Sequence, residues 1–143
     1  MNPTIATNVI EPRGDILSYH AHVYFDPART RTEAETLRQR IAERFSVQLG
    51  RWHDVPVGPH TAAMYQVAFA TEVFAAFVPW LMLNRGDLDV LVHPNTLAPR
   101  DDHLRHALWL GHVLPLREDV LPLRIDAADE SPVVPNTAPG SGA

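Results

Sequence analysis

The sequence predicts an α+β fold, a ferredoxin-like βαββαβ sandwich with a four-stranded antiparallel sheet and two helices on one face. Three observations support this fold class. The predicted elements follow the order strand, helix, strand, strand, helix, strand. The strand segments have a two-residue periodicity, and the helical segments repeat apolar residues every three or four positions. Right-handed crossovers would order the strands fourth, first, third, second, and would leave one sheet face without helices.

The first predicted strand, residues 19–25, reads Tyr-His-Ala-His-Val-Tyr-Phe. Aromatic and β-branched residues of this kind favour an extended strand. Because side chains alternate between the two faces of a strand, His20, His22 and Tyr24 share one face and the apolar residues share the other. Two histidines opposite an apolar face indicate a site, although a half-exposed surface strand would give the same pattern.

Two helices are predicted between the strands. The first spans residues 30–45, where apolar residues recur at helical spacing and charged residues occupy the other side. The second, strongly apolar, runs from Thr71 to Leu83, and Gly86 is a plausible left-handed stop after it. The three remaining strands are predicted at residues 47–52, 63–70 and 88–93.

The sequence predicts one domain with a segment on either side. An irregular leader covers residues 1–15, the domain covers residues 16–123, and residues 124–143 form a tail rich in proline, glycine, serine and acidic residues. The tail has no helix or strand periodicity, and we expect it to be disordered. Near the end of the domain a short helical piece is expected from Leu104 to Leu110.

The composition limits the possible functions. The chain has 143 residues, 45% hydrophobic and 20% charged, with a formal net charge of -5, which predicts a soluble globular protein. With 12 Lys and Arg against 17 Asp and Glu, no nucleic-acid partner is expected. Cysteine is absent, which excludes disulfides, zinc–thiolate sites and thiol nucleophiles.

No targeting or membrane segment is predicted. Residues 1–13 contain no apolar segment of the kind found in secretory signals, and the longest apolar run, residues 73–83, is too short to span a bilayer. A cytoplasmic location without membrane contact is therefore the expectation.

Three histidines are predicted to converge on the open sheet face. The first and fourth strands are neighbours in the expected order, so His93 should lie beside His20 and His22, with Gln66 of the third strand on the same face. Imidazoles on adjacent strands can each offer one ring nitrogen to a metal ion. A hydrogen-bonded histidine cluster, under a lid or at a dimer interface, is the alternative.

Several segments resemble the DOPA 4,5-dioxygenase family, in order and at fitting intervals from about residue 19 to residue 116. This family resemblance implies a ferredoxin-like fold and extradiol cleavage of a catechol ring at a non-haem metal. The matching segments are Tyr19-His20-Ala21-His22-Val23-Tyr24-Phe25, Gly58-Pro59-His60, Met64-Tyr65-Gln66-Val67, Trp80-Leu81-Met82-Leu83-Asn84-Arg85-Gly86, Val90-Leu91-Val92-His93-Pro94-Asn95-Thr96 and Asp102-His103.

Extradiol cleavage needs a metal with open positions, a base and an acid, and the histidines of these segments can supply each role. His20, His22 and His93 are the candidate metal ligands, with Fe(II) the expected metal and Zn or Mn as alternatives. His60 and His103 come from loops and are the candidate acid and base, since histidine can transfer protons near neutral pH. The substrates would be a small, DOPA-like catechol and O2.

The ligand set has open alternatives. His60 should enter near His22 and Tyr24, and it would displace His20 if it were a ligand. A carboxylate from Asp89, Asp101 or Asp102 could complete a facial triad, but an all-histidine triad fits equally well.

Substrate contacts are expected from side chains around the histidines and from a guanidinium fork that can bind a carboxylate. The alternative to substrate binding for the Asn84-Arg85 pair is that it forms a solvated helix end. The candidates are Tyr24, Gln66, Asn84 and Arg85. His53, His106 and His112 are expected at the surface or in packing, and Trp80 and Trp109 in the core.

The open face needs a cover, because water would intercept a reactive oxygen intermediate. The apolar patches of residues 97–123 are expected to fold over the site, with Asp102 and His103 at the near edge, and to pair two subunits in a homodimer. The alternative function is a non-catalytic ferredoxin-like module that binds a metabolite or a partner on its histidine-lined face.

Overall fold

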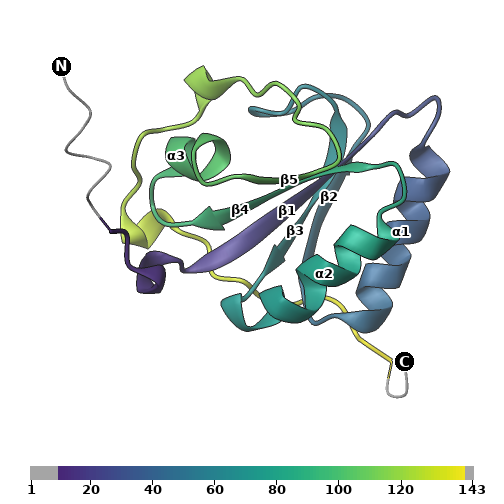
Figure 1. The fold of residues 1–143 in the computed structure, drawn as a ribbon, viewed down its shortest axis with the longest axis horizontal. Helices are drawn as coiled ribbons and strands as arrows, with labels where there is room; N and C mark the ends of the chain where they lie inside the picture. The colour runs from purple at the N-terminus through teal and green to yellow at the C-terminus, as the bar shows by residue number, and fades with distance from the viewer. Residues whose placement is uncertain (1–9, 141–143) are drawn as a thin grey trace.

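Five antiparallel strands form one sheet in the order β2-β3-β1-β4-β5 (Figure 1). The structure is a computed structural model, and it describes residues 10–140. The strands are β1 (Ser18–Phe25), β2 (Gln48–His53), β3 (Ala63–Phe69), β4 (Asp89–Asn95) and β5 (Leu108–Leu110). The α-helices are α1 (Arg31–Arg44), α2 (Phe74–Asn84) and α3 (Pro99–Leu104), and single 3-10 turns lie at Arg13–Asp15, Thr71–Val73, Glu118–Val120 and Ala127–Asp129.

The α+β class and the predicted order of the first four strands are confirmed, but the prediction of a four-stranded sheet is wrong. The fifth strand, β5, pairs with residues 90–92 of β4. It lies inside the segment Leu104–Leu110, where a helix was expected, and the helix α3 instead lies earlier in the chain. The reason is a tertiary one: β5 has three residues, and its extended form depends on the hydrogen bonds that the edge of β4 offers.

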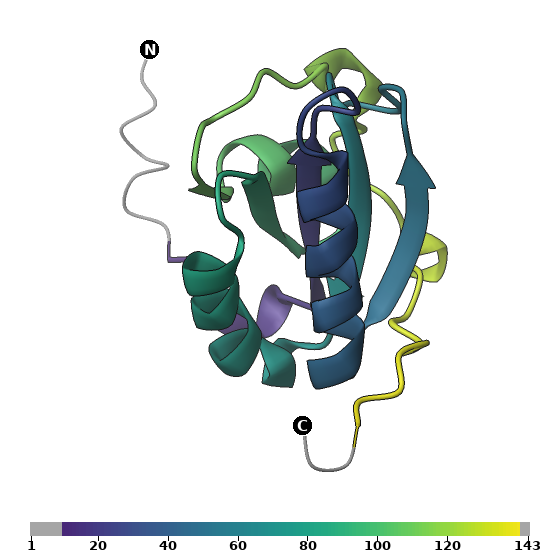
Figure 2. The same ribbon diagram turned by 90° about the vertical axis from the view of Figure 1, so that its right-hand side faces the viewer.

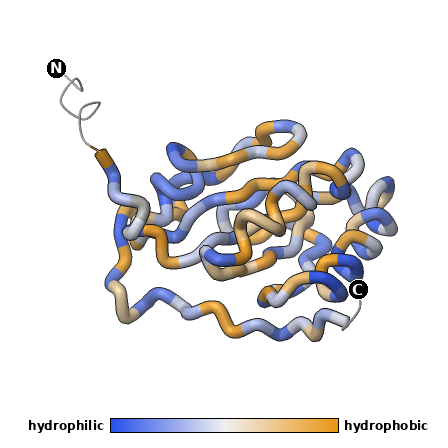
Figure 3. The backbone as a smooth tube through the Cα atoms, turned by 60° about the horizontal axis from the view of Figure 1, so that its bottom comes forward, coloured by the Kyte–Doolittle hydropathy of each residue, from blue (hydrophilic) through white to orange (hydrophobic). Residues whose placement is uncertain are grey.

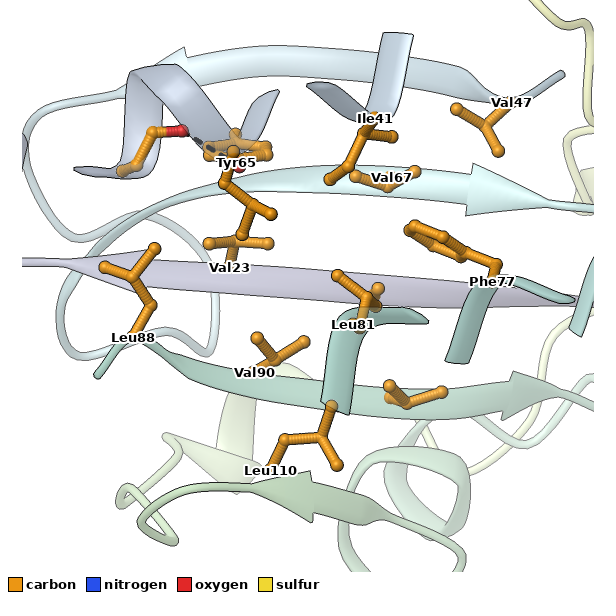
Figure 4. Close-up of a cluster of buried hydrophobic side chains, with 14 of the residues drawn as sticks. Val23, Ile41, Val47, Tyr65, Val67, Phe77, Leu81, Leu88, Val90 and Leu110 are labelled. Carbon is orange, nitrogen blue, oxygen red and sulfur yellow. Dashed lines mark hydrogen bonds between the residues drawn. The ribbon is translucent and has the colours of Figure 1, made fainter. Parts of the chain in front are cut away.

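One face of the sheet, the helix face, packs against α1 and α2 and forms the main core (Figure 2). From the strands it receives alternate residues, such as Val23, Val67 and Val90, because side chains alternate along a strand. Ile41 of α1 and Leu81 of α2 point onto these residues (Figure 4). The buried residues Ala34, Leu37 and Ile41 of α1 and Phe77, Val78 and Leu81 of α2 fix the two helices on this face.

The opposite face, which we call the histidine face, carries His20, His22 and Tyr24 of β1. In the register of the sheet His20 lies opposite His93 of β4, and His22 lies opposite Gln66 of β3. Cross-strand partners point to the same side of a sheet. The β1 strand therefore divides its side chains between the core on one side and the histidines on the other, as the alternation predicted.

Residues 97–123 cover the histidine face, as expected. A second, smaller apolar cluster joins the sheet residues Tyr24, Met64 and Leu91 to the covering segment. On the sheet side all three are buried. The residues of the cover that pack against them are Ala107, Trp109, Leu114 and Leu116.

Residues 130–140 run beside β2, as a separate stretch of chain that is visible in Figure 3. The side chain of Asn136 accepts a hydrogen bond from the Leu49 backbone N–H (2.8 Å) and donates one to the Leu49 carbonyl (2.9 Å). Thr137 Oγ1 accepts from the Val47 N–H (3.0 Å). Because β2 is an edge strand, these bonds satisfy backbone groups that a further strand would otherwise use.

This path differs from the disorder expected for the tail, residues 124–143. The interactions that hold it are hydrogen bonds of single polar side chains and backbone hydrogen bonds from Asn136 N–H to Val47 and from Gly140 N–H to Glu43, and neither kind leaves a periodicity in the sequence. The division of the chain into leader, domain and tail stays a prediction. Residues 1–9 of the leader and 141–143 of the tail lie outside the described residues.

Candidate metal centre

Five histidines from four parts of the chain meet on the histidine face. His20 and His22 come from β1, His93 from β4, His103 from α3, and His60 from the loop before β3. The ring centroids of His93 and His103 are 3.8 Å apart, and those of His22 and His60 are 4.2 Å apart. The proximity expected from the strand order is confirmed, and the two loop histidines join the same cluster.

His22 and His93 form the most buried part of the cluster, with exposed fractions of 2% and 1%. Their Nε2 atoms are 3.1 Å apart. His93 Nδ1 lies 2.8 Å from the carbonyl oxygen of Pro94, which can only accept, so Nδ1 carries the proton and Nε2 presents a lone pair. A backbone carbonyl in this position is the usual way in which a protein orients a metal-binding imidazole.

Two groups of three histidines have the geometry to hold a metal ion. One consists of His20, His22 and His93, and the other of His22, His60 and His103. Within each group the candidate ligand atoms lie within 4.8 Å of one another. Each group could hold a metal ion, to which imidazole nitrogens bind at about 2.0–2.1 Å. Among the described residues both groups consist of histidine alone, and they share His22.

The donor set fits a metal for a further reason. Among residues 10–140, the buried Nδ1 atom of His22 has no hydrogen-bond partner. An unpaired buried polar atom costs about 1–3 kcal/mol. A bound metal would offset this cost, and the buried histidine groups could hold one.

Each loop histidine is held through its Nδ1 atom. His60 Nδ1 shares a 2.7 Å hydrogen bond with the hydroxyl of Tyr24, and the Tyr24 ring stacks on Trp109 at 5.7 Å between centroids. His103 Nδ1 lies 2.7 Å from the Pro99 carbonyl and donates to it. In both residues Nε2 is left to bind a metal or to exchange a proton.

The environment keeps the cluster uncharged. Burial lowers the pKa of His20 to about 4, and the neighbouring charge of His103 acts in the same direction. Burial and the other imidazoles likewise lower the pKa of His60 to about 4. For His22 and His93, burial first and the adjacent histidines second hold the pKa well below the ordinary value. Neutral imidazole is the form that binds a metal.

A comparison with known protein families shows to which family the chain belongs. Residues 19–120 match the model of the Dopa 4,5-dioxygenase family. The chain belongs to this family. The resemblance noted from the sequence segments is thereby confirmed.

Two curated fungal proteins are similar to the chain. An uncharacterized 21.2 kDa protein of Botryotinia fuckeliana is 38% identical over 110 residues, which cover 69% of this chain and 60% of that protein. A DOPA 4,5-dioxygenase of Amanita muscaria is 33% identical over 120 residues, covering 78% of this chain and 53% of that enzyme. The matched regions are thus little more than half the length of these relatives.

A solved structure is also similar. The crystal structure of a candidate dioxygenase from Nostoc punctiforme superposes with a TM-score of 0.76 and is 50% identical, covering 78% of this chain and 96% of that one. The fold is thus shared with a solved structure, and the family membership rests on the matching sequence.

In this family member the candidate carboxylates are engaged elsewhere. Asp102 accepts hydrogen bonds from Thr96, and Asp89 accepts from the exposed His112. Asp101 lines a cavity of about 790 Å³ that His93 also lines, but it belongs to neither histidine group. No carboxylate among the described residues joins the two histidine groups, so the arrangement favours a histidine-only site.

The four candidate substrate contacts separate into two pairs. Tyr24 and Gln66 lie on the histidine face, Tyr24 bound to His60 and Gln66 opposite His22. The structure does not bring Asn84 and Arg85 into the cluster. They stand at the end of α2, the helix that covers the other face, and they donate to nearby backbone carbonyls: Asn84 to Trp80, and Arg85 to Gly86 and Leu88.

The sequence reading did not identify the groups that orient the histidines. The carbonyls of Pro94 and Pro99 are backbone atoms and have no signal in a sequence. Trp109, expected in the core, packs against Tyr24 in the cover of the site. Asp102 and Thr96 were visible as polar residues near a site, but nothing in the spacing showed that they bind each other.

Proposed function

We propose that the protein is a metal-dependent extradiol dioxygenase that cleaves the ring of a small, DOPA-like catechol with O2. The observation that carries this proposal is the buried histidine cluster, whose free ring nitrogens face one another on the sheet of a Dopa 4,5-dioxygenase family member. Extradiol cleavage needs a metal with open positions, and imidazole ligands suit non-haem iron. Fe(II) is the proposed metal, with Zn and Mn as alternatives.

His20, His22 and His93 are the proposed ligands. The Nε2 atoms of His22 and His93 already approach each other, and the Pro94 carbonyl fixes the ring of His93. We assign His60 to proton transfer, although the geometry also allows it to replace His20 as a ligand. When bound, the metal would supply a Lewis acid and a redox centre for the catechol and O2.

The chain itself would move the protons. His103 donates Nδ1–H to the Pro99 carbonyl, which leaves Nε2 free to take a proton from a catechol hydroxyl. The His60 ring lies 4.2 Å from that of His22 and 6.3 Å from that of His103, measured between centroids, and Tyr24 holds its Nδ1 atom, so it is placed to return a proton. Neutral rings at pH 7 are the form that can accept a proton.

The covering segment would keep water from the reaction. Trp109, Leu114 and Leu116 pack on Tyr24 and Leu91 above the sheet. His20 and His103 are only partly buried, so a substrate would reach the cluster from their side. We propose that Gln66 and Tyr24 contact the catechol there, and that Asn84 and Arg85 do not.

Metal analysis with oxygen uptake tests the proposal. The protein is purified anaerobically, its metal content is measured, and a panel of catechols is screened on an oxygen electrode with and without added Fe(II). Stoichiometric iron with oxygen consumption supports the dioxygenase. A protein that stays metal-free and consumes no oxygen after Fe(II) addition would contradict it and favour the non-catalytic binding module.

Assembly and location stay predictions. Within residues 10–140 no helix is long and apolar enough to cross a membrane. The homodimer expected from the sequence is checked by light scattering at micromolar concentration. A particle of 16.0 kDa, the mass of one chain, would contradict the dimer and leave residues 97–123 as a cover within one subunit.

A further inference from the structure

A carboxylate beside the histidine cluster has no role in the proposed chemistry. Asp102 in α3 is 2% exposed, and its two oxygens accept hydrogen bonds from the Thr96 backbone N–H (2.8 Å) and the Thr96 hydroxyl (2.6 Å). We propose that Asp102 is a positioning residue: through Thr96 it holds α3 at the end of β4 so that His103 faces His93. This inference rests on the proposed role of His103 as acid or base.

The short helix α3 depends on its anchors. It has six residues, and a helix of this length does not persist on its own in water. Arg100 ties one side of α3 to the covering segment, with bonds from its N–H to the Pro122 carbonyl and from its Nε to the Leu121 carbonyl. Asp102 ties the other side to Thr96, the residue that follows β4. Of these two anchors, only the hydrogen bonds between Asp102 and Thr96 fix the position of α3 relative to β4, the strand that carries His93.

The loop between Thr96 and α3 is held in a strained conformation. Leu97 has φ 71°, and it is the one residue other than glycine with a positive φ among residues 10–140. A bulky side chain in the left-handed region costs on the order of 1–3 kcal/mol and persists only where the surroundings enforce it. The two hydrogen bonds that Thr96 donates to Asp102 close this loop, and the Leu97 carbonyl accepts from Ile125 N–H at 2.9 Å.

The position of α3 determines where the His103 ring lies. Its ring is fixed within the helix by the hydrogen bond to Pro99, so the ring moves with the helix and not independently. The ring lies 3.8 Å from His93 and 5.9 Å from His22, measured between centroids. A displacement of α3 by about 1 Å would misplace an acid or base, which can cost about 100-fold in rate.

The kinetic test is a double-mutant cycle. The rate of oxygen uptake by the Fe(II)-loaded protein is measured with 3,4-dihydroxyphenylalanine as probe. Asp102→Asn, which keeps the shape but replaces one acceptor by a donor, is expected to lower kcat by about 10- to 100-fold at nearly unchanged KM and iron content. In a His103→Gln background the same change should have little further effect, since Asp102 acts through His103.

The spectroscopic test does not need activity. In metal-free protein labelled with 15N-histidine, the ring nitrogen signals of His103 should shift in Asp102→Asn and in Thr96→Val, whereas Thr96→Ser keeps the hydroxyl donor and should preserve them. Ser18→Ala is the matched control, because it removes another buried hydrogen bond at the same sheet end, the one that Asn95 Nδ2 donates to Ser18 Oγ at 3.0 Å. It should leave the His103 signals in place.

The outcomes separate this inference from the proposed function. If the wild type consumes no oxygen, the proposed function fails, and the ring signals alone decide on the positioning role. An effect of Asp102→Asn that adds fully to that of His103→Gln, or an equal effect of Ser18→Ala, would overturn it. So would unfolding of both Asp102→Asn and Thr96→Val in a thermal melt, because the link would then serve folding rather than His103.

Discussion

The two faces of the sheet are built from the same strands, but one forms the apolar core and the other carries the histidine cluster. On β1, Val23 faces α1 and α2 in the closed apolar core, and the adjacent His22 faces the histidine cluster. Helices that bury wide apolar stripes close the helix face. The histidine face is closed by one short helix, one three-residue strand and irregular chain held by hydrogen bonds.

The difference teaches where stability and chemistry come from. Apolar burial contributes roughly 25 cal/mol per Å² and is favourable wherever it occurs, so the helix face stabilises the fold. The imidazoles of the histidine face are buried with lowered pKa values and an unpaired nitrogen on His22, which costs free energy. This cost in free energy is expected for a site whose ring nitrogens are left without protein partners so that they can bind a ligand. Changes on the two faces should therefore have separable consequences.

The largest effect is expected from removing the ligand that both candidate groups share. His22→Ala should abolish stoichiometric metal binding and oxygen uptake while the fold survives, since the core lies on the other face. Metal content and circular dichroism are measured on the same sample. His112→Ala, a change at an exposed histidine, should keep the metal. Full metal occupancy in His22→Ala would contradict the ligand assignment.

The next effect concerns proton transfer without loss of metal. His103→Gln, and separately His60→Gln, should retain the metal and lower turnover by about 10²–10⁴-fold, the usual contribution of general acid–base catalysis. The exposed His106, three residues beyond His103, offers His106→Gln as the control, which should turn over normally. Wild-type rates in both test variants would leave these two histidines without a catalytic role.

Sequence periodicity was sufficient for the parts that local patterns determine. The alternation in β1 predicted both faces, and the order of elements predicted which strands are neighbours, hence the meeting of His20 with His93. The stop after α2 also followed from the sequence, since Gly86 has φ 61°, a conformation that glycine adopts without strain.

Tertiary hydrogen bonds determine the parts that the sequence could not show. Leu104 and Leu108 are four residues apart, which imitates a helical stripe, yet Leu108 belongs to a strand that forms only against β4. Asp101 and Asp102 are indistinguishable in sequence, and only the folded loop brings Asp102 to Thr96. The path of the tail depends on Asn136 in the same way.

On the helix face a large truncation should cost stability and leave the metal site intact. Leu81 of α2 is completely buried in the main core, so Leu81→Ala should lower the free energy of unfolding by about 2–5 kcal/mol. Leu83 on the same helix is 86% exposed, and Leu83→Ala should change the free energy of unfolding little. Urea unfolding of the metal-free proteins measures both. Loss of metal affinity in refolded Leu81→Ala would show that the two faces are coupled.

The histidine face should also make the stability of the fold depend on pH. His20 and His60 have a pKa of about 4 in the folded protein, below the ordinary value of 6.5 expected after unfolding. Below pH 6.5 these two histidines therefore become protonated in the unfolded chain while they stay neutral in the folded chain. The stabilisation is complete above pH 6.5 and is lost as the pH falls from 6.5 toward 4, by at most about 1.4 kcal/mol per pH unit for each histidine.

Urea unfolding of the metal-free protein between pH 7.5 and pH 4.5 measures this slope. Carboxylates contribute with mixed sign, since burial raises the pKa of Asp102 and a hydrogen bond from Trp52 lowers that of Asp54. The difference between the wild type and His60→Gln isolates the histidine. The variant should lose less stability than the wild type over this range, because one group that must stay unprotonated in the fold has been removed. Parallel curves would mean that His60 is protonated equally easily in both states and that its burial carries no electrostatic cost.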